Sequence, residues 1–304
     1  MIKTTGDIFG RVMTAMITPF DDDLNIDYKA VEKIVAHLIS TGTSTIVVSG
    51  TTGESPTLDE TEKKDLLKAV VEIAAGKVKI IMGTGSNDTR KSIKLSLEAE
   101  KLGANGLLLV APYYNKPSQD GLKAHFSAIA KETSLPIILY NIPGRTGINL
   151  TAESTLELAE SHKNIVALKD STGSVEQAQE VGRLAPAHFR VYSGDDNLTL
   201  PFLSVGACGV ISVASHVIGN EIKRMIEAFY EGKVDDARAV HYLHLPLFKG
   251  LFVAPNPTCV KYAMAKLGLC KENLRLPLVP LSDSQKSFMD QLLQELKPVA
   301  GVKK

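Results

Sequence analysis

Lys169 is the residue of this chain best suited to covalent chemistry on a carbonyl group. It ends a short apolar run, and if its side chain points into a barrel, those of Ala167 and Ile165 point the same way. Val166 and Leu168 then face the surrounding helices. A lysine among small apolar neighbours is poorly solvated, which favours the neutral amine that attacks a carbonyl carbon. Lys169 is therefore a candidate Schiff-base nucleophile.

Two other roles for Lys169 remain open at this point. Its amine can reach water at the barrel rim, or it can pair with the neighbouring Asp170. Tyr140 ends the preceding apolar run with the same inward parity as Ile138, so its hydroxyl is placed to move protons for the amine. A tyrosine at a barrel end also commonly serves in packing alone.

Three further polar residues suit the same chemistry. A neutral tyrosine is a poor base, so a relay through Thr51 or Thr52 in GTTGES (50–55) is useful, although two threonines between glycines also suit a plain turn. Arg145 follows Tyr140 by five residues in the loop YNIPGRTG (140–147). There its guanidinium can clamp a carboxylate with two hydrogen bonds.

Other glycine-rich turns and the histidines give weaker indications. GTGSN (83–87) and SGDD (193–196) can cradle a phosphate or simply turn the chain, and no Walker lysine follows them. The seven histidines form neither HExxH nor HxH, so the sequence predicts no catalytic metal. Only His216 closely follows an expected strand, whereas His37, His125 and His162 are expected to be structural or exposed.

The elements that position these residues form a repeating pattern of short aliphatic runs and longer amphipathic segments, which predicts parallel strands joined by helices. About eight such units predict an α/β fold of the (β/α)8 barrel class, with reactive groups at the carboxyl ends of the strands. The expected strands are Val12–Thr18, Thr45–Ser49, Lys79–Gly83, Gly106–Val110, Pro136–Tyr140, Ile165–Lys169, Arg190–Ser193 and Gly209–Ser212, and the helices between them include Tyr28–Ser40, Asp59–Ala75 and Asp88–Leu102.

Local residues support these boundaries. Asp59 and Asp88 are suitable helix N-caps, and Gly42, Gly76 and Gly103 stand just past expected helices, where a left-handed residue is often needed. A doubly wound sheet is the main alternative fold. No GxGxxG follows the first expected strand, so we prefer the barrel.

Strand patterns stop near Tyr230 and three helical segments follow. We therefore expect a catalytic barrel over residues 1–230 and a helical extension over 231–304 packed on it, with no low-complexity linker between them.

Composition narrows the possible partners. Lys plus Arg and Asp plus Glu both number 34, so net charge favours neither a nucleic acid nor a membrane surface as partner, and a small ligand is expected. No secretory or membrane-spanning pattern is present, which predicts a cytoplasmic protein. Cys208, Cys259 and Cys270 lack metal or disulfide spacing and are expected to be buried or semi-buried thiols.

GTTGES, PYYNKP, YNIPGRTG and ALKDSTG occur in an order and spacing that resemble the dihydrodipicolinate synthase branch of the pyruvate-dependent class I aldolases. The resemblance covers nearly the whole chain. It implies that Lys169 forms a Schiff base with pyruvate, that Tyr140 transfers protons with Thr51 and Tyr114 as relay partners, and that Arg145 holds the carboxylate of L-aspartate 4-semialdehyde.

The same resemblance assigns supporting roles and a product. Thr52 and Gly194 would seat the pyruvate carboxylate, with Asn256 near them. Family members are usually homotetramers in which a tyrosine of the YY pair crosses an interface, so Tyr114 is expected to serve a neighbouring site. The product would be 4-hydroxy-tetrahydrodipicolinate, on the route to diaminopimelate and lysine, and no organic cofactor is required.

Regulation is where the chain departs from the family pattern. Many members bind lysine in a cleft between subunits, and Ser55, Asn87 and Tyr113 fit that cleft. Lys91 stands where lysine-sensitive members carry an acid, and Glu60 and Lys63 replace histidines. A cation at position 91 repels lysine, so we expect weak or absent feedback.

Three alternatives remain open. Another lyase of the same superfamily, such as N-acetylneuraminate lyase or a 2-keto-3-deoxy-sugar-acid aldolase, shares the lysine and the tyrosine. A metal-dependent aldolase or a non-catalytic ligand-binding barrel would not use Lys169.

Overall fold

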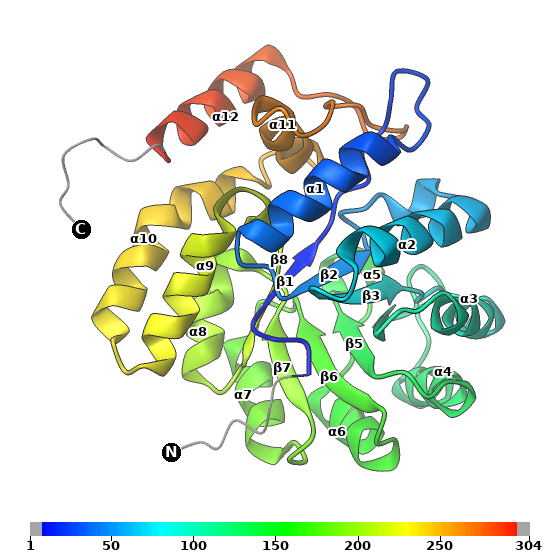
Figure 1. Ribbon diagram of the computed structural model, residues 1–304. Helices are drawn as coiled ribbons and strands as arrows, with labels where there is room; N and C mark the ends of the chain where they lie inside the picture. Colours follow the sequence, from blue (N-terminus) through cyan, green and yellow to red (C-terminus); the bar gives the residue numbers. More distant parts are fainter. Residues whose placement is uncertain (1–7, 297–304) are drawn as a thin grey trace.

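The computed structural model describes residues 8–296. Eight parallel strands form a closed barrel in sequence order, and helices surround it (Figure 1). This confirms the (β/α)8 barrel predicted from the sequence. The strands are β1 (Val12–Ala15), β2 (Thr45–Val48), β3 (Lys79–Gly83), β4 (Gly106–Val110), β5 (Ile137–Asn141), β6 (Ile165–Asp170), β7 (Arg190–Ser193) and β8 (Gly209–Ser212).

The helices of the described part cover the outside of the barrel and extend past its last strand. They are α1 (Tyr28–Ser40), α2 (Glu60–Ala74), α3 (Thr89–Lys101), α4 (Gln119–Glu132), α5 (Pro143–Thr146), α6 (Ala152–Ser161), α7 (Val175–Leu184), α8 (Thr199–Ser204), α9 (Ser215–Tyr230), α10 (Val234–Gly250), α11 (Thr258–Lys266) and α12 (Asp283–Glu295), with 3-10 turns η1 (Ser55–Thr57) and η2 (Asp196–Leu198). The caps predicted at Asp59 and Asp88 are confirmed, because the Asp59 carboxylate accepts one backbone N–H of the following helix and the Asp88 carboxylate accepts two.

The first strand is shorter than predicted. We expected Val12–Thr18, but β1 ends at Ala15. The N–H of Ile17 leaves the sheet and donates to Nε2 of the buried His216, 3.1 Å away. A side chain from the far end of the barrel sequence thus replaces a strand partner, and no local pattern predicts this.

The strand that carries the candidate lysine contains an irregularity. β5 and β6 pair with Ile137 opposite Ile165, but the next pair is Ile138 opposite Ala167. Val166 is therefore an extra residue in β6 at this point. Such an insertion changes which side chains face inward.

The inward parity predicted for β6 is accordingly wrong in its first half. Val166 belongs to the apolar cluster inside the barrel and Ile165 to the outer core, the reverse of the prediction. Ala167 lies inside and Leu168 outside, as predicted. The register is regular again where Lys169 pairs with β5 and β7.

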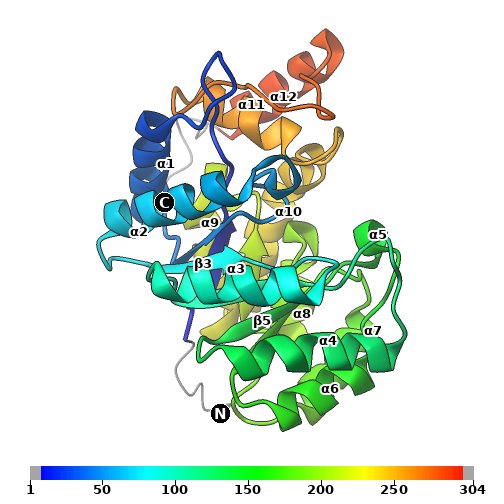
Figure 2. The same ribbon diagram turned by 90° about the vertical axis from the view of Figure 1, so that its right-hand side faces the viewer.

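The segment after Tyr230 is helical, as predicted, and packs on the rest of the chain. Helix α10 packs against α9 and α12, and α11 packs against α9 and α12. Figure 2 shows α11 and α12 on the side of α1, away from α4 and α6. The ends of the two predicted units, residues 1–7 and 297–304, lie outside the described residues.

Two other sequence expectations concern the described residues alone. Within residues 8–296, no helix is long and apolar enough to cross a membrane. Cys208 and Cys259 are buried and Cys270 is partly buried, in line with the expectation for the three thiols.

Two histidines are held neutral by burial. His216 is fully buried, and desolvation lowers its pKa to about 4. His125 accepts from or donates to the Thr89 hydroxyl through Nδ1, and burial lowers its pKa to about 4 against the opposing charge of Asp88. Both rings bind a proton more readily in the unfolded chain, where the histidine pKa is about 6.5.

Through these two histidines, acid should destabilise this fold below about pH 6.5. Between about pH 6.5 and about pH 4 these two side chains bind more protons in the unfolded chain than in the native one, so their contribution to the free energy of unfolding falls as pH falls. Urea unfolding of the wild type and of His125→Gln at about pH 7 and about pH 5 measures this, and the variant should lose less stability over that interval. Equal losses in the two proteins would contradict the assignment to His125.

Candidate active site

A cavity of about 340 Å³ lies at the carboxyl ends of β2 to β5 and is lined by loops that follow these strands. It brings together half of the twelve site residues predicted from the sequence. The predicted site residues that line it are Thr51, Ser55, Lys91, Tyr113, Tyr140 and Arg145. Four other predicted site residues do not line the cavity, and the contacts that show where they lie are described below: Lys169, Thr52, Gly194 and Asn256.

Lys169 lies directly beside Tyr140. The two residues are register partners on β6 and β5, and the lysine Nζ is 4.2 Å from the centre of the tyrosine ring. The lysine is 6% exposed. This rules out the solvated rim lysine that the sequence left open, and it places a buried amine next to the phenol.

The second alternative, an ion pair with Asp170, is also absent. One oxygen of the Asp170 carboxylate accepts both the N–H (2.8 Å) and the hydroxyl (2.6 Å) of Thr172. Burial raises the pKa of Asp170, and these two hydrogen bonds oppose the rise. Within residues 8–296, no carboxylate forms an ion pair with Lys169, so its amine is not committed to a structural partner.

Gly194 packs against the lysine. A Cβ at this position would lie 3.1 Å from Lys169 Cε and 1.9 Å from Ser171 Oγ. The Gly194 N–H also donates to the Asp170 carbonyl at 2.7 Å. An added methyl group would displace the Ser171 hydroxyl and crowd the lysine stem, so the missing side chain allows the chain after β7 to lie close to Lys169.

The loop after β2 contains both candidate threonines. Thr51 lines the cavity, while Thr52 is buried and its Oγ1 accepts a hydrogen bond from Asn256 Nδ2 at 2.9 Å. The structure thus joins Thr52 and Asn256, which are far apart in the sequence. Ser49 and Glu54, at either end of the loop, have left-handed φ angles of 56° and 52°, which non-glycine residues adopt only when their surroundings hold them.

Arg145 stands at the mouth of the cavity. It belongs to the single-turn helix α5, which Pro143 begins and which Gly147 ends with a φ of 73°. The arginine is exposed and lines the cavity. The guanidinium is therefore accessible from the cavity, and its role as a carboxylate clamp stays a prediction.

The two neighbouring tyrosines lie differently. Tyr113 lines the cavity and is 41% exposed, whereas Tyr114 is 89% exposed and lies outside its lining. Tyr114 also has a left-handed φ of 73°. The single chain therefore does not bring Tyr114 to Tyr140, and the relay role of Tyr114 stays a prediction that requires another subunit.

The candidate regulatory cleft is an outer part of the same cavity. Its lining includes Ser55, Lys63, Lys91 and Tyr113. Asn87 stands just outside and donates through Nδ2 to the Tyr113 carbonyl at 3.2 Å. Two lysines thus face a space next to the candidate active site.

Asp195 is a further charged residue near Lys169 that was not predicted as a site residue. Burial raises its pKa to about 6, and the positive charges of Lys169 and Arg145 oppose that rise. The neighbouring Asp196 is fully engaged, because it accepts from Ser212 and from two backbone N–H groups. The paired acids of SGDD, directly after β7, were the available indication that an acidic group lies near the lysine.

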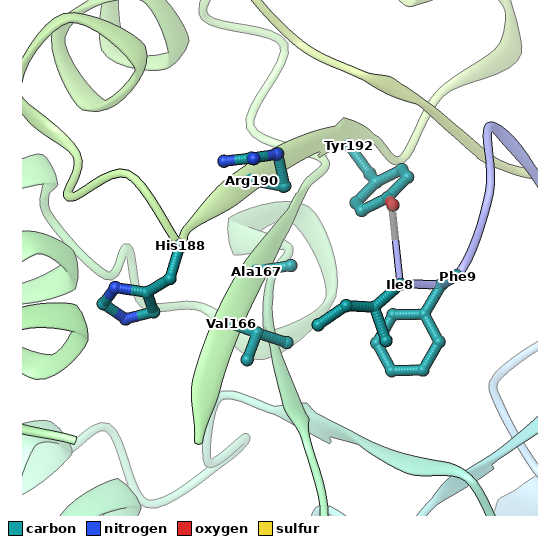
Figure 3. Close-up of a pocket in the computed structure, with 7 residues that line it drawn as sticks. All are labelled: Ile8, Phe9, Val166, Ala167, His188, Arg190 and Tyr192. Atoms are coloured by element: carbon teal, nitrogen blue, oxygen red, sulfur yellow. The ribbon is translucent and has the colours of Figure 1, made fainter. Parts of the chain in front are cut away.

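A second cavity, of about 200 Å³, lies at the opposite end of the barrel (Figure 3). Apolar side chains of Ile8, Phe9, Val166 and Ala167 form part of its lining, and the Tyr192 hydroxyl donates to the Gly10 carbonyl at 3.0 Å. Residues at this end of such barrels commonly contribute to stability. Among residues 8–296 no cluster of three or more His, Cys, Asp and Glu side chains suits a metal ion.

Residues 8–296 match the Dihydrodipicolinate synthetase family. The 4-hydroxy-tetrahydrodipicolinate synthase 1 of Halalkalibacterium halodurans is 54% identical over 281 residues, which cover 92% of this chain and 95% of that protein. The dihydrodipicolinate synthase of Cyanidioschyzon merolae, solved with lysine bound, is 46% identical with a TM-score of 0.94, over 95% of this chain and 99% of that one.

A third similar protein was solved with a ligand. The chloride-inhibited dihydrodipicolinate synthase of Acinetobacter baumannii, complexed with pyruvate, is 37% identical with a TM-score of 0.92, over 94% of this chain and 98% of that one.

Gly194→Ala should impair the reactivity of the lysine without unfolding the barrel. The new methyl group forces Ser171 aside and presses on Lys169 Cε, so labelling of the lysine by a small 2-oxo acid and borohydride should slow about tenfold or more. Gly144→Ala is the control, because a Cβ there meets nothing within 4 Å. Equal labelling rates in both variants would show that the close approach of Gly194 is unimportant.

Proposed function

The chain belongs to the dihydrodipicolinate synthetase family, and we propose that Lys169 is the residue through which it acts. It is an enzyme, a lyase of the 4-hydroxy-tetrahydrodipicolinate synthase type, in lysine and diaminopimelate biosynthesis. The observation that carries the assignment of Lys169 is a buried amine beside Tyr140 with no carboxylate partner among the described residues.

The first half of the reaction forms a covalent enamine. The neutral Lys169 amine adds to the keto carbon of pyruvate, and the Tyr140 hydroxyl hands protons between nitrogen and oxygen until water leaves. The resulting iminium draws electrons from the adjacent methyl group, which loses a proton. Thr51, at the same cavity, is the proposed relay partner of Tyr140.

The second half joins the two substrates and frees the enzyme. The enamine carbon attacks the aldehyde of L-aspartate 4-semialdehyde, whose own amine then displaces Lys169 and closes the ring of 4-hydroxy-tetrahydrodipicolinate. Arg145, exposed at the cavity mouth, holds the carboxylate of the semialdehyde with its two-pronged guanidinium. Thr52, Gly194 and Asn256 seat the carboxylate of pyruvate.

The proposal includes a homo-oligomer. Tyr114 is 89% exposed on a loop next to the cavity, which supports its insertion into a neighbouring subunit, and a tetramer is the arrangement expected from the family. A cytoplasmic location is likewise proposed from the sequence.

The nearest alternative is a related lyase that joins pyruvate to another aldehyde. Arg145 favours the semialdehyde, because a sugar aldehyde presents hydroxyls rather than a carboxylate to the cavity mouth. Turnover of aspartate semialdehyde, N-acetylmannosamine and glyceraldehyde under one set of conditions tests this assignment. Preference for a sugar aldehyde would replace it.

The Schiff base itself can be trapped. Pyruvate and borohydride should attach a stable adduct to the wild type at Lys169, located by peptide mass spectrometry, and Lys169→Met should lose the adduct and lower kcat by at least about 1000-fold. The control is Lys163→Met, which alters an exposed lysine just before the same strand. An adduct at another lysine, or none in the wild type, would refute the mechanism.

Free lysine should inhibit this enzyme weakly or not at all. Lys91 and Lys63 both line the cavity, and each repels a second ammonium placed there. Glu60 in the same lining is already paired with Lys94. Initial rates measured across a lysine series should stay flat in the wild type, whereas Lys91→Glu should increase sensitivity to lysine. An inhibition constant in the sub-millimolar range for the wild type would contradict the prediction.

A further inference from the structure

The loop after β2 is tied to the C-terminal extension by a buried ion pair. Glu54, at the end of GTTGES, is 2% exposed and pairs with Lys261 of α11, which is 0% exposed. The lysine Nζ also donates to the Asn273 carbonyl at 2.8 Å and lies 4.0 Å from the centre of the Phe20 ring. Both charges are thus inside the protein, outside the catalytic cavity.

Arg275 strengthens the same tie. The backbone N–H of Arg275 donates to the second carboxylate oxygen of Glu54 at 3.1 Å. Its guanidinium donates to the Thr57 carbonyl at 2.8 Å and to both carboxylate oxygens of Glu62. The extension therefore holds the loop both at Glu54 and just beyond it.

A separate contact from the extension reaches the loop two residues earlier. Asn256 donates to Thr52 Oγ1 at 2.9 Å. Between Thr52 and Glu54, the Gly53 carbonyl accepts a hydrogen bond from Thr18 Oγ1 at 2.7 Å. Thr52 and Glu54 are thus fixed on either side of Gly53 by contacts that come from outside the loop.

The energetics of a buried ion pair suggest a positional role. Removing two charges from water costs several kcal/mol per ion, and apolar residues of similar volume often stabilise a fold as well or better. A charge-assisted hydrogen bond also fixes geometry, because the ammonium and the carboxylate must lie at a defined distance and angle. Glu54 also holds a left-handed φ of 52°, a conformation that persists only when its surroundings determine it.

We propose that the Glu54–Lys261 ion pair is a clamp through which the C-terminal extension sets the position of Thr51 and Thr52 for pyruvate capture. Glu54 and Lys261 are positioning residues and do not touch the substrate. The inference rests on the proposed function, in which Thr51 relays protons and Thr52 seats the pyruvate carboxylate. Arg145 stands on α5, outside the clamped loop.

Because Arg145 lies outside the clamped loop, loss of the clamp should change the KM for pyruvate and not the KM for aspartate semialdehyde. When the loop moves, the KM for pyruvate should rise and kcat should fall, each by about tenfold, while the KM for aspartate semialdehyde stays unchanged. Simple loss of folded protein would lower the apparent kcat and leave both KM values as they are. The pair of KM values therefore distinguishes positioning from stability.

The experiment compares Glu54→Gln, Lys261→Met and the double variant of the full-length enzyme. Each single variant leaves one buried charge without its partner and should lower the melting temperature. The double variant removes both charges, so its melting temperature should recover towards that of the wild type, while its pyruvate KM stays raised. Lys266→Met, which breaks a half-exposed ion pair with Asp290 at the end of the same helix, is the control and should leave all kinetic constants unchanged.

The outcomes separate this inference from the proposed function. Pyruvate KM values equal to the wild type in all three variants would overturn the clamp, as would a double variant that regains both stability and pyruvate KM. Failure of the wild type to form a pyruvate adduct at Lys169 would overturn the proposed function instead. A wild type that forms the adduct, with variants of raised pyruvate KM, supports both.

Discussion

The register between β5 and β6 is the constraint on which the site depends. It sets Tyr140 opposite Lys169, and the closed barrel then surrounds the pair with neighbouring strands that exclude water. Because the amine has no carboxylate partner among the described residues, it is left available for covalent chemistry. A barrel fixes such a pair more firmly than a loop does, since every strand is held on both sides.

The remaining groups of the site come from loops, and these are held by contacts rather than by local preference. Ser49, Glu54 and Tyr114 have left-handed backbone conformations that cost free energy for residues with a Cβ. Hydrogen bonds and the buried ion pair from the extension compensate for that cost at the β2 loop. Asp195 lies near Lys169, and burial raises the pKa of its carboxyl group. The charge that Asp195 carries therefore depends on the surrounding structure as well as on its residue type.

The sequence predicted the elements well because their periodicity and caps are local. Asp59 and Asp88 cap their helices as expected, and Lys169 lies beside Tyr140 because each is the next-to-last residue of its strand and the two are register partners. The inward parity of Ile165 and Val166 was wrong, since one extra residue in β6 is specified by pairing with β5 and not by the alternation of residue types. The contacts of Glu54 and Thr52 with the extension were not predicted, because no local pattern links residues so distant. The relay role of Tyr114 stays a prediction, since this residue is 89% exposed in the single chain.

The distance along the chain between the two halves of the clamp has a consequence for biosynthesis. All eight strands are complete at Ser212, yet Asn256 and Lys261 lie well beyond that point. A ribosome thus releases enough chain to close the barrel before it releases the residues that fix the β2 loop. If the clamp sets the position of this loop, catalytic competence is acquired only near the end of translation, and a chain that ends before Asn256 lacks activity even though it contains all eight strands.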